Sequence, residues 1–262
     1  MTELTMSQKY MTSNDCYKQN RHITPQGIMI HSTATPGVRS GAWFDRWNMP
    51  GVEKAVHSFI DDKQGFQYLP WTLRGWHCGS GPKGSGNNTH IAIELCEPGG
   101  FTYQNGAMVG YNVVKQTPYF QGIWSNAVAL CVSLCREFNL TERNILCHSE
   151  GHALGIASNH ADVMQWFPRH GKDMDDFRTA VKEALKNKET EEEPMTQEQF
   201  NSMMMEYTRQ QTALVASDWA NEAWDRAIAA GLLDGSAPHG PLTREQAALL
   251  LERLGAYGPE QA

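Results

Sequence analysis

The chain has 262 residues, of which 40% are hydrophobic and 19% charged, and its formal net charge is −7 at pH 7. This length suffices for one large domain, or for a medium and a small domain, with a sizeable core. Residues 1–187 hold 17 basic and 16 acidic side chains, whereas residues 188–262 hold 5 and 13. An acidic chain without a basic cluster argues against nucleic-acid binding and against electrostatic docking to membranes.

The chain carries no evident targeting or membrane signal. Residues 1–9 lack the charged and then apolar segments of a secretory signal, and no run approaches the ~20 apolar residues of a membrane span. We therefore expect synthesis in a cytoplasm and no membrane insertion. The six cysteines form no C-x-x-C pair, and we expect no disulfide framework. Cys131 and Cys135, four apart on a predicted helix, are expected to be buried.

Strand and helix patterns alternate along the first two thirds of the chain. Apolar, β-like runs predict strands over 28–32, 56–61, 66–70, 90–96 and 144–147, with a hairpin turn over 61–65. In the 90–96 strand, Ile91, Ile93 and Leu95 fall on one face. Apolar spacing of three and four residues predicts helices over 119–138 and 173–187. This interleaving predicts an α/β layer fold.

A polar, acidic segment closed by Pro194 predicts a domain boundary over 188–195. Beyond it, helices are predicted over 196–213, 217–230 and 243–254. Thr196 and Thr243 each precede a glutamine by three residues, which is the pattern of a capping box. We therefore expect a domain over 1–187 and a small all-helical module over 196–262.

Two histidines end predicted strands more than a hundred residues apart, which suggests that they meet at one edge of the sheet. His31 follows Ile28-Met-Ile and His148 follows Ile145-Leu-Cys. With Asp162 they form a set typical of a catalytic zinc site, in which water takes the fourth position. Each could instead have an ordinary role, as a core histidine or a turn aspartate. His152 is the alternative ligand from the loop after His148.

Glu94 lies in the middle of an apolar strand, where a carboxylate is costly unless it is paired or functional. It is the candidate general base; the alternative is a buried salt bridge with Arg74 or Lys83. Glu97 is the weaker candidate, because it falls on the opposite face of the strand. Trp76 and His77 lie in a glycine-bounded turn and either pack in the core or line a substrate cleft.

Together these patterns resemble one family. Residues from about 20 to 187 resemble the type-2 zinc N-acetylmuramoyl-L-alanine amidases, which share a fold with T7-type lysozyme and peptidoglycan recognition proteins. The resemblance is carried, in the order of the family, by His31-Ser-Thr, Val56-His-Ser-Phe-Ile-Asp, Gly75-Trp-His-Cys-Gly, Ile91-Ala-Ile-Glu94, and His148 followed by Asp162 before Trp166-Phe-Pro168. It implies a mixed central β-sheet flanked by helices.

The resemblance also implies roles for individual residues. The zinc ligands fall on His31, His148 and Asp162, and the catalytic glutamate falls on Glu94. The interval between His148 and Asp162 is longer than in most relatives, with 151–157 as the extra loop. Relatives commonly carry a lysine two residues before the third ligand; here His160 stands there and is expected to stabilise an oxyanion.

The implied activity is hydrolysis of the amide between N-acetylmuramic acid and L-alanine in peptidoglycan. The predicted absence of a signal makes the chain similar to a phage or prophage endolysin, which reaches the wall after release. The alternatives are a non-catalytic peptidoglycan-binding protein of the same fold, or a cytoplasmic amidase that recycles muropeptides. Residues 217–246 resemble one surface-layer-homology module, which predicts wall binding; the alternative is self-association into a homo-oligomer through the C-terminal helices.

Overall fold

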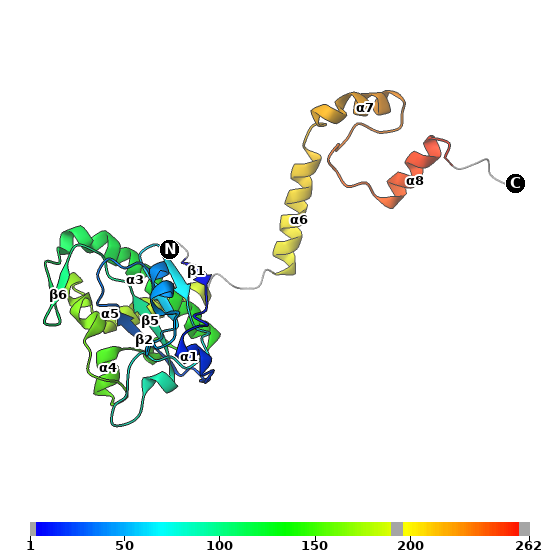
Figure 1. Cartoon of the computed structure of the whole chain (residues 1–262). Coiled ribbons are helices and arrows are strands. Elements are labelled where there is room, and N and C mark those ends of the chain that lie inside the picture. Colours follow the sequence, from blue (N-terminus) through cyan, green and yellow to red (C-terminus); the bar gives the residue numbers. More distant parts are fainter. Residues whose placement is uncertain (1–3, 190–195, 257–262) are drawn as a thin grey trace. The chain divides into compact units, whose positions relative to one another are not determined.

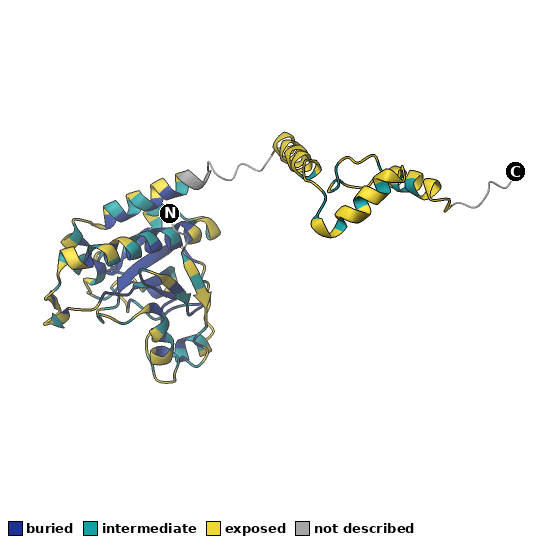
Figure 2. Ribbon diagram, turned by 90° about the horizontal axis from the view of Figure 1, so that it is seen from above, coloured by how far each residue is buried: buried dark blue, intermediate teal, exposed yellow. Residues whose placement is uncertain are grey.

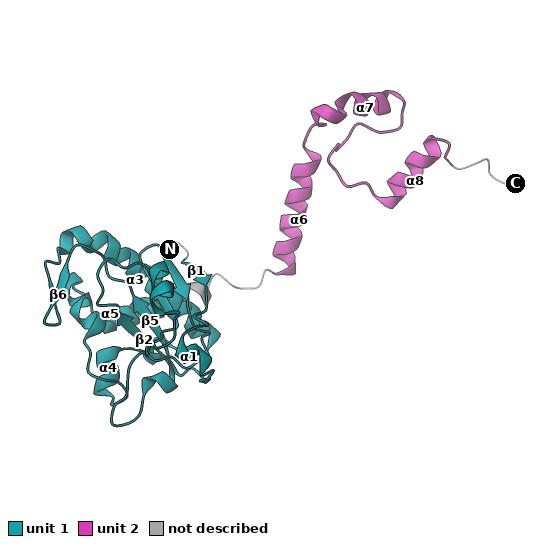
Figure 3. Cartoon of the chain, viewed as in Figure 1, with its two compact units in different colours: residues 1–191 teal, residues 192–262 magenta. Residues whose placement is uncertain are grey.

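The structure, a computed structural model, describes residues 4–189 and 196–256. The chain divides into two compact units, residues 1–191 and 192–262 (Figure 3), and each is described by itself. Apart from residues 188–189, the predicted linker 188–195 lies outside the described residues. None of the described helices is long and apolar enough to cross a membrane.

The first unit is built on a six-stranded sheet (Figure 1). The strand order is β1 (Thr5–Gln8), β4 (Gln64–Gln67), β3 (Ser58–Ile60), β5 (His90–Leu95), β2 (Gly27–Ser32) and β8 (Ile145–Cys147). Only β3 and β4 pair antiparallel; the other neighbours are parallel. The predicted mixed sheet, and the hairpin that joins β3 to β4, are therefore confirmed. Strands β6 (Thr102–Gln104) and β7 (Ala107–Val109) form a separate hairpin.

Two long helices cover one face of this sheet. Ile91, Ile93 and Leu95 of β5 share a buried cluster with α3 (Val113–Glu137) and α5 (Met174–Glu189). The opposite face carries Ala92 of the same strand and Cys96 just after it, packed with Trp43 and Trp47 of α2 (Trp43–Trp47). Figure 2 shows the buried strands beneath helices that expose their outer sides. The predicted alternation along β5 is confirmed. Successive side chains point to opposite faces of the sheet, and each face packs against different elements.

Both long helices were predicted, with shifted ends. Helix α3 begins at Val113, six residues before its predicted start, because the Asn112 side chain accepts a hydrogen bond from the Lys115 N–H. Pro118 lies inside α3 without ending it. Three short helices, α1 (Asp15–Lys18), α2 and α4 (His148–Ala153), were not predicted, because a helix this short shows no periodicity.

The second unit contains the three predicted helices: α6 (Gln197–Thr212), α7 (Asp218–Ala229) and α8 (Arg244–Arg253). The capping boxes at Thr196 and Thr243 are confirmed, because each threonine accepts from the N–H three residues on and each glutamine side chain reaches back. None of the described side chains on these helices is buried. Trp219 is 91% exposed, so the apolar side chains of this unit are available for contacts outside it.

All six cysteines are free, as expected from the lack of a disulfide pattern, and all are buried in the first unit. Burial raises the pKa of the Cys135 thiol to about 11, so this side chain remains a neutral, apolar group at neutral pH. These residues act as small core side chains rather than as nucleophiles or metal ligands.

His57 joins three segments of the first unit. Its Nε2–H donates to the Leu73 carbonyl over 2.7 Å, and its Nδ1 accepts from the Ala92 N–H over 2.9 Å. The ring is fully buried, and burial lowers its pKa to about 4. Because the pKa is lower in the folded state than in the unfolded state, stability is lost as the pH falls from about 6.5 towards 4.

We expect His57 alone to lower the free energy of unfolding by about 2 kcal/mol between pH 7 and pH 5. The variant His57→Gln should be less stable at pH 7, because it weakens two buried hydrogen bonds, but it should lack this acid-dependent loss. Urea unfolding of both proteins at pH 5, 6 and 7 measures the difference between their pH slopes. An equal pH dependence of the free energy of unfolding in the two proteins would contradict the lowered pKa of His57.

Candidate metal centre

Three parallel strands bring the candidate residues to one edge of the sheet. His31 of β2 lies directly opposite Glu94 of β5, and on its other side Ile30 pairs with Cys147, the residue before His148. Parallel strands place their C-terminal ends at the same edge. His148 is the first residue of α4, immediately after β8. The site therefore lies on the sheet face opposite α3 and α5.

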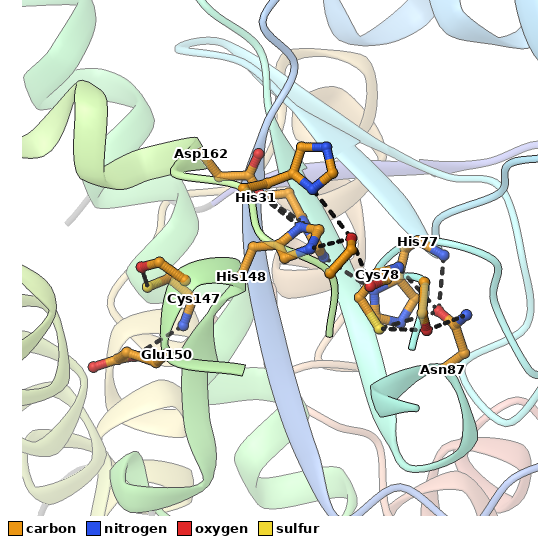
Figure 4. Close-up of polar contacts among 12 residues, drawn as sticks. His31, His77, Cys78, Asn87, Cys147, His148, Glu150 and Asp162 are labelled. Carbon is orange, nitrogen blue, oxygen red and sulfur yellow. Dashed lines mark hydrogen bonds and ion pairs between the residues drawn. The ribbon is translucent and has the colours of Figure 1, made fainter. Parts of the chain in front are cut away.

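Three electron-pair donors converge on one point (Figure 4). Asp162 Oδ2 is 2.9 Å from His31 Nδ1 and 2.8 Å from His148 Nδ1, and the two Nδ1 atoms are 3.2 Å apart. Donor atoms bound to one tetrahedral Zn²⁺ at 2.0–2.1 Å are separated by roughly 3.3 Å, so this set fits zinc with little adjustment. Two imidazoles and one carboxylate also match the donors of catalytic zinc sites, which leave a fourth position open.

The electrostatics favour metal binding. Burial lowers the pKa of His31, so the ring is neutral at neutral pH and can offer a nitrogen lone pair to a metal. Burial opposes the charge on Asp162, but the hydrogen bonds of His148 and His31 outweigh it and hold its pKa below the usual range. Asp162 has φ of 46°, in the left-handed region that is costly for most residues. That backbone conformation turns the carboxylate toward the two histidines.

His152, the alternative ligand, lies outside this cluster. Its ring is on an exposed residue of α4, and its Nδ1–H donates to the Ala157 carbonyl over 3.2 Å. His148 comes directly after the strand, whereas His152 follows one helical turn later. The structure therefore groups His148, and not His152, with His31 and Asp162.

Glu94 is a half-buried residue, and its carboxyl has no hydrogen-bond or ion-pair partner among the described residues. Its Oε2 has no hydrogen-bond partner among the described residues, and those residues include no ion pair to it from Arg74 or Lys83. The suggested buried salt bridge is therefore wrong; Arg74 donates instead to Asn88 Oδ1 over 2.7 Å. Burial, followed by the negative charges of Asp162 and Glu97, raises the pKa of Glu94. A carboxyl held in this way can accept and return a proton.

Glu97 has a different environment. It is fully buried, and its Oε1 accepts a hydrogen bond of 2.8 Å from the Tyr103 hydroxyl on β6. Burial raises its pKa to about 7. This carboxyl links the segment just after β5 to the β6–β7 hairpin.

The other candidate residues are distributed around the centre. His160 is exposed, with its ring centroid 4.8 Å from that of His148 and its Nδ1 3.1 Å from Ser158 Oγ. Trp76 packs against the cluster of Cys16, Ala55, Leu69 and Leu73. His77 lies against His31, with its Nδ1 3.0 Å from His31 Nε2. Burial lowers the pKa of His77 well below its ordinary value, so the ring is neutral.

Sequence reasoning missed Ser158. Its Oγ lies 3.2 Å from His148 Nε2, on the side of that ring opposite Asp162. Serine is common in loops, and nothing in the local pattern distinguishes this one. Its position at the end of the extra loop 151–157 was the only available signal.

Comparison with known proteins identifies the family. The model of the N-acetylmuramoyl-L-alanine amidase family matches residues 20–166, more than half of the chain. The fold, the donor set and this match define the chain as a member of the N-acetylmuramoyl-L-alanine amidase family.

Individual relatives match over shorter stretches. The amidase XlyA of Bacillus subtilis is 38% identical over 77 residues, 29% of this chain and 26% of the relative. The amidase CwlA of a Bacillus species is 24% identical over 154 residues, 57% of this chain and 53% of the relative. The chain thus spans between a quarter and about half of the length of these curated relatives.

Solved structures share the fold. A mutant endolysin from Bacillus subtilis superposes with a TM-score of 0.51 at 23% identity, covering 68% of this chain and 99% of that one. The Staphylococcus aureus hydrolase AmiA superposes with a TM-score of 0.56 at 16% identity, covering 74% and 89%. At these identities the likeness shows the fold alone.

Proposed function

We propose that this chain hydrolyses the amide bond between N-acetylmuramic acid and L-alanine in peptidoglycan, as a zinc enzyme. The observation that carries the proposal is the convergence of His31, His148 and Asp162 on one point, with the partnerless carboxyl of Glu94 on the next strand. Membership of the amidase family and the names of the curated relatives support the same reaction.

The residues have distinct roles in this proposal. His31, His148 and Asp162 hold the metal, and Zn²⁺ supplies polarisation of a water molecule and of the scissile carbonyl when bound. Glu94 accepts the proton of the attacking water and delivers it to the leaving amine of L-alanine. His160 donates an N–H to the oxygen that gains negative charge. Its exposure and its closeness to His148 suit a group that faces substrate.

Lysis of purified cell walls tests the activity. The protein should lower the turbidity of a wall suspension, and a strong chelator should stop the decline because the reaction needs the metal. Adding Zn²⁺ in excess of the chelator should restore it. A wall suspension that stays turbid in all three conditions would contradict the proposal, as would clearing that ignores the chelator.

The two alternative functions differ from this one in what they require. A binding protein of the same fold needs neither a metal site nor Glu94, and a carboxyl whose buried Oε2 has no partner is costly to keep for structure alone. A muropeptide-recycling amidase needs no wall-binding module. The appended helical unit therefore favours an endolysin-type enzyme that acts on the intact wall.

For the second unit we propose wall binding, with residues 1–187 as the catalytic domain, 188–195 as the linker and 196–262 as the binding module. Every proposed catalytic residue precedes the linker. A module that binds the polymer raises the local concentration of the catalytic domain at its substrate. Self-association is the alternative, because Phe200, Met203, Met204 and Tyr207 form an exposed apolar face on α6.

Truncation to residues 1–187 should keep zinc and should cleave small soluble muropeptides at a rate close to that of the full chain. On intact walls its activity should fall by roughly tenfold or more, because tethering is lost. The two rates are measured side by side at matched concentration.

The isolated fragment 188–262 distinguishes the two proposed roles of the module. Pelleting of the fragment with cell walls supports anchoring, whereas a dimer that stays in the supernatant contradicts anchoring.

A further inference from the structure

The outward nitrogen of His31 has a specific partner. Nδ1 of His31 faces Asp162 and the proposed metal position, so with a metal on Nδ1 the ring proton of the neutral imidazole would lie on Nε2. Nε2 is 3.0 Å from Nδ1 of His77, and the two rings meet edge to face at 75°. In that metal-bound state His77 Nδ1 accepts this hydrogen bond, and the proton of the neutral His77 ring lies on Nε2.

His148 is held in the same way from the other side. Its Nδ1 faces Asp162, and its Nε2 lies 3.2 Å from Ser158 Oγ, to which it would donate with a metal on Nδ1. Ser158 is fixed by its backbone N–H, which donates to the Cys78 carbonyl over 2.8 Å, and its hydroxyl is 3.2 Å from the same oxygen. A Cβ at Gly79 would stand 3.2 Å from Ser158 Oγ, so glycine allows this close approach.

The turn that carries His77 and Cys78 thus supports both imidazoles (Figure 4). The backbone N–H groups of His77 and Cys78 both donate to Asn87 Oδ1, over 2.8 and 3.1 Å. Asn87 is buried, at 6% exposure, so the turn that carries His77 is anchored inside the protein. The ring of His77 reaches His31, and the carbonyl of Cys78 reaches His148 through Ser158.

We propose that His77 and Ser158 are positioning residues of the metal centre, which set the tautomer and the orientation of His31 and His148. This inference rests on the proposed zinc site and assigns His77 a place behind a ligand rather than on the wall of the substrate cleft. Removing a hydrogen-bond partner of this kind lowers metal affinity by roughly 10–100-fold, because an imidazole that is free to rotate or to change tautomer binds the metal less tightly. The long loop after His148 then has a function in this chain, which is to deliver Ser158.

Zinc affinity of folded variants tests the proposal without any assay of activity. In His77→Asn the side-chain oxygen can occupy the place of Nδ1, whereas in His77→Gln the amide lies one methylene further out. We expect the dissociation constant for Zn²⁺, measured by competition with a chromophoric chelator, to rise roughly 10–100-fold in His77→Gln and clearly less in His77→Asn. Ser158→Ala should also weaken binding, because His148 Nε2–H loses its acceptor.

His22→Ala serves as the matched control, because it removes an exposed imidazole that contacts only Asn20 among the described residues. Its zinc affinity should equal that of the wild type. The positioning role would be overturned if zinc affinity stayed close to wild type in all three variants, His77→Gln, His77→Asn and Ser158→Ala. Equal losses in His77→Asn and His77→Gln would also overturn it for His77, since they would indicate a general structural effect. A wild-type chain that binds no zinc would instead refute the proposed metal site.

Discussion

Replacing Asp162 with alanine is expected to remove zinc and hydrolysis together. The carboxylate is the only anionic donor of the cluster and lies within 2.9 Å of both Nδ1 atoms. Without it, two neutral imidazoles remain, which is fewer than the three protein ligands of a catalytic zinc site. We expect less than roughly one tenth of the wild-type zinc content after dialysis, measured as metal per chain by mass spectrometry, and amine release at the level of the blank.

His152→Ala is the control for this experiment, because His152 comes from the same loop and was the alternative ligand. It should keep one zinc per chain, since its ring lies outside the cluster. If His152→Ala loses zinc while Asp162→Ala keeps it, the proposed ligand set is wrong. Loss in both variants would point to a general disturbance of the loop.

Glu94→Gln should slow hydrolysis by roughly 10²–10⁴-fold, the usual contribution of a positioned acid–base group. The amide has nearly the same shape, so zinc content should stay at one per chain. The metal-free variant should also be more stable than metal-free wild type at neutral pH, because burial, Asp162 and Glu97 all disfavour a charge at this position. Release of amines from cell walls and thermal unfolding measure the two effects.

Glu97→Gln is a matched control, because it neutralises another buried carboxyl three residues along the chain. Glu97 Oε1 is hydrogen-bonded to the Tyr103 hydroxyl of the β6–β7 hairpin, which gives this carboxyl a structural role. Hydrolysis by Glu97→Gln should therefore remain within about tenfold of the wild-type rate. Near-normal activity in Glu94→Gln, or equal losses in both variants, would remove Glu94 from the mechanism.

Much of the fold could be predicted because its signals are local. The alternation along β5 follows from strand geometry, and the capping boxes at Thr196 and Thr243 follow from two side chains three residues apart. The meeting of His31 and His148 could be expected because both end strands of one sheet. Strand β1 was missed, because it is a short edge strand with mostly exposed side chains and no apolar alternation.

The details of the site needed three-dimensional information. Asp162 reaches the histidines through a left-handed backbone conformation that no local pattern reveals. The choice between His148 and His152 depends on where α4 begins, and α4 is too short to be predicted. The contacts of His77 with His31 and of Ser158 with His148 join segments far apart in the sequence. Such contacts depend on loop paths, for which spacing carries no signal.

Product analysis on a defined substrate tests the proposed reaction most directly. A muramyl peptide that retains its sugar is incubated with the zinc-loaded protein, and the products are identified by mass spectrometry. We expect a saccharide with an intact lactyl carboxylate and a peptide with a free N-terminal L-alanine. Cleavage within the glycan or between two amino acids of the peptide, or an unchanged substrate, would contradict the proposed amidase activity.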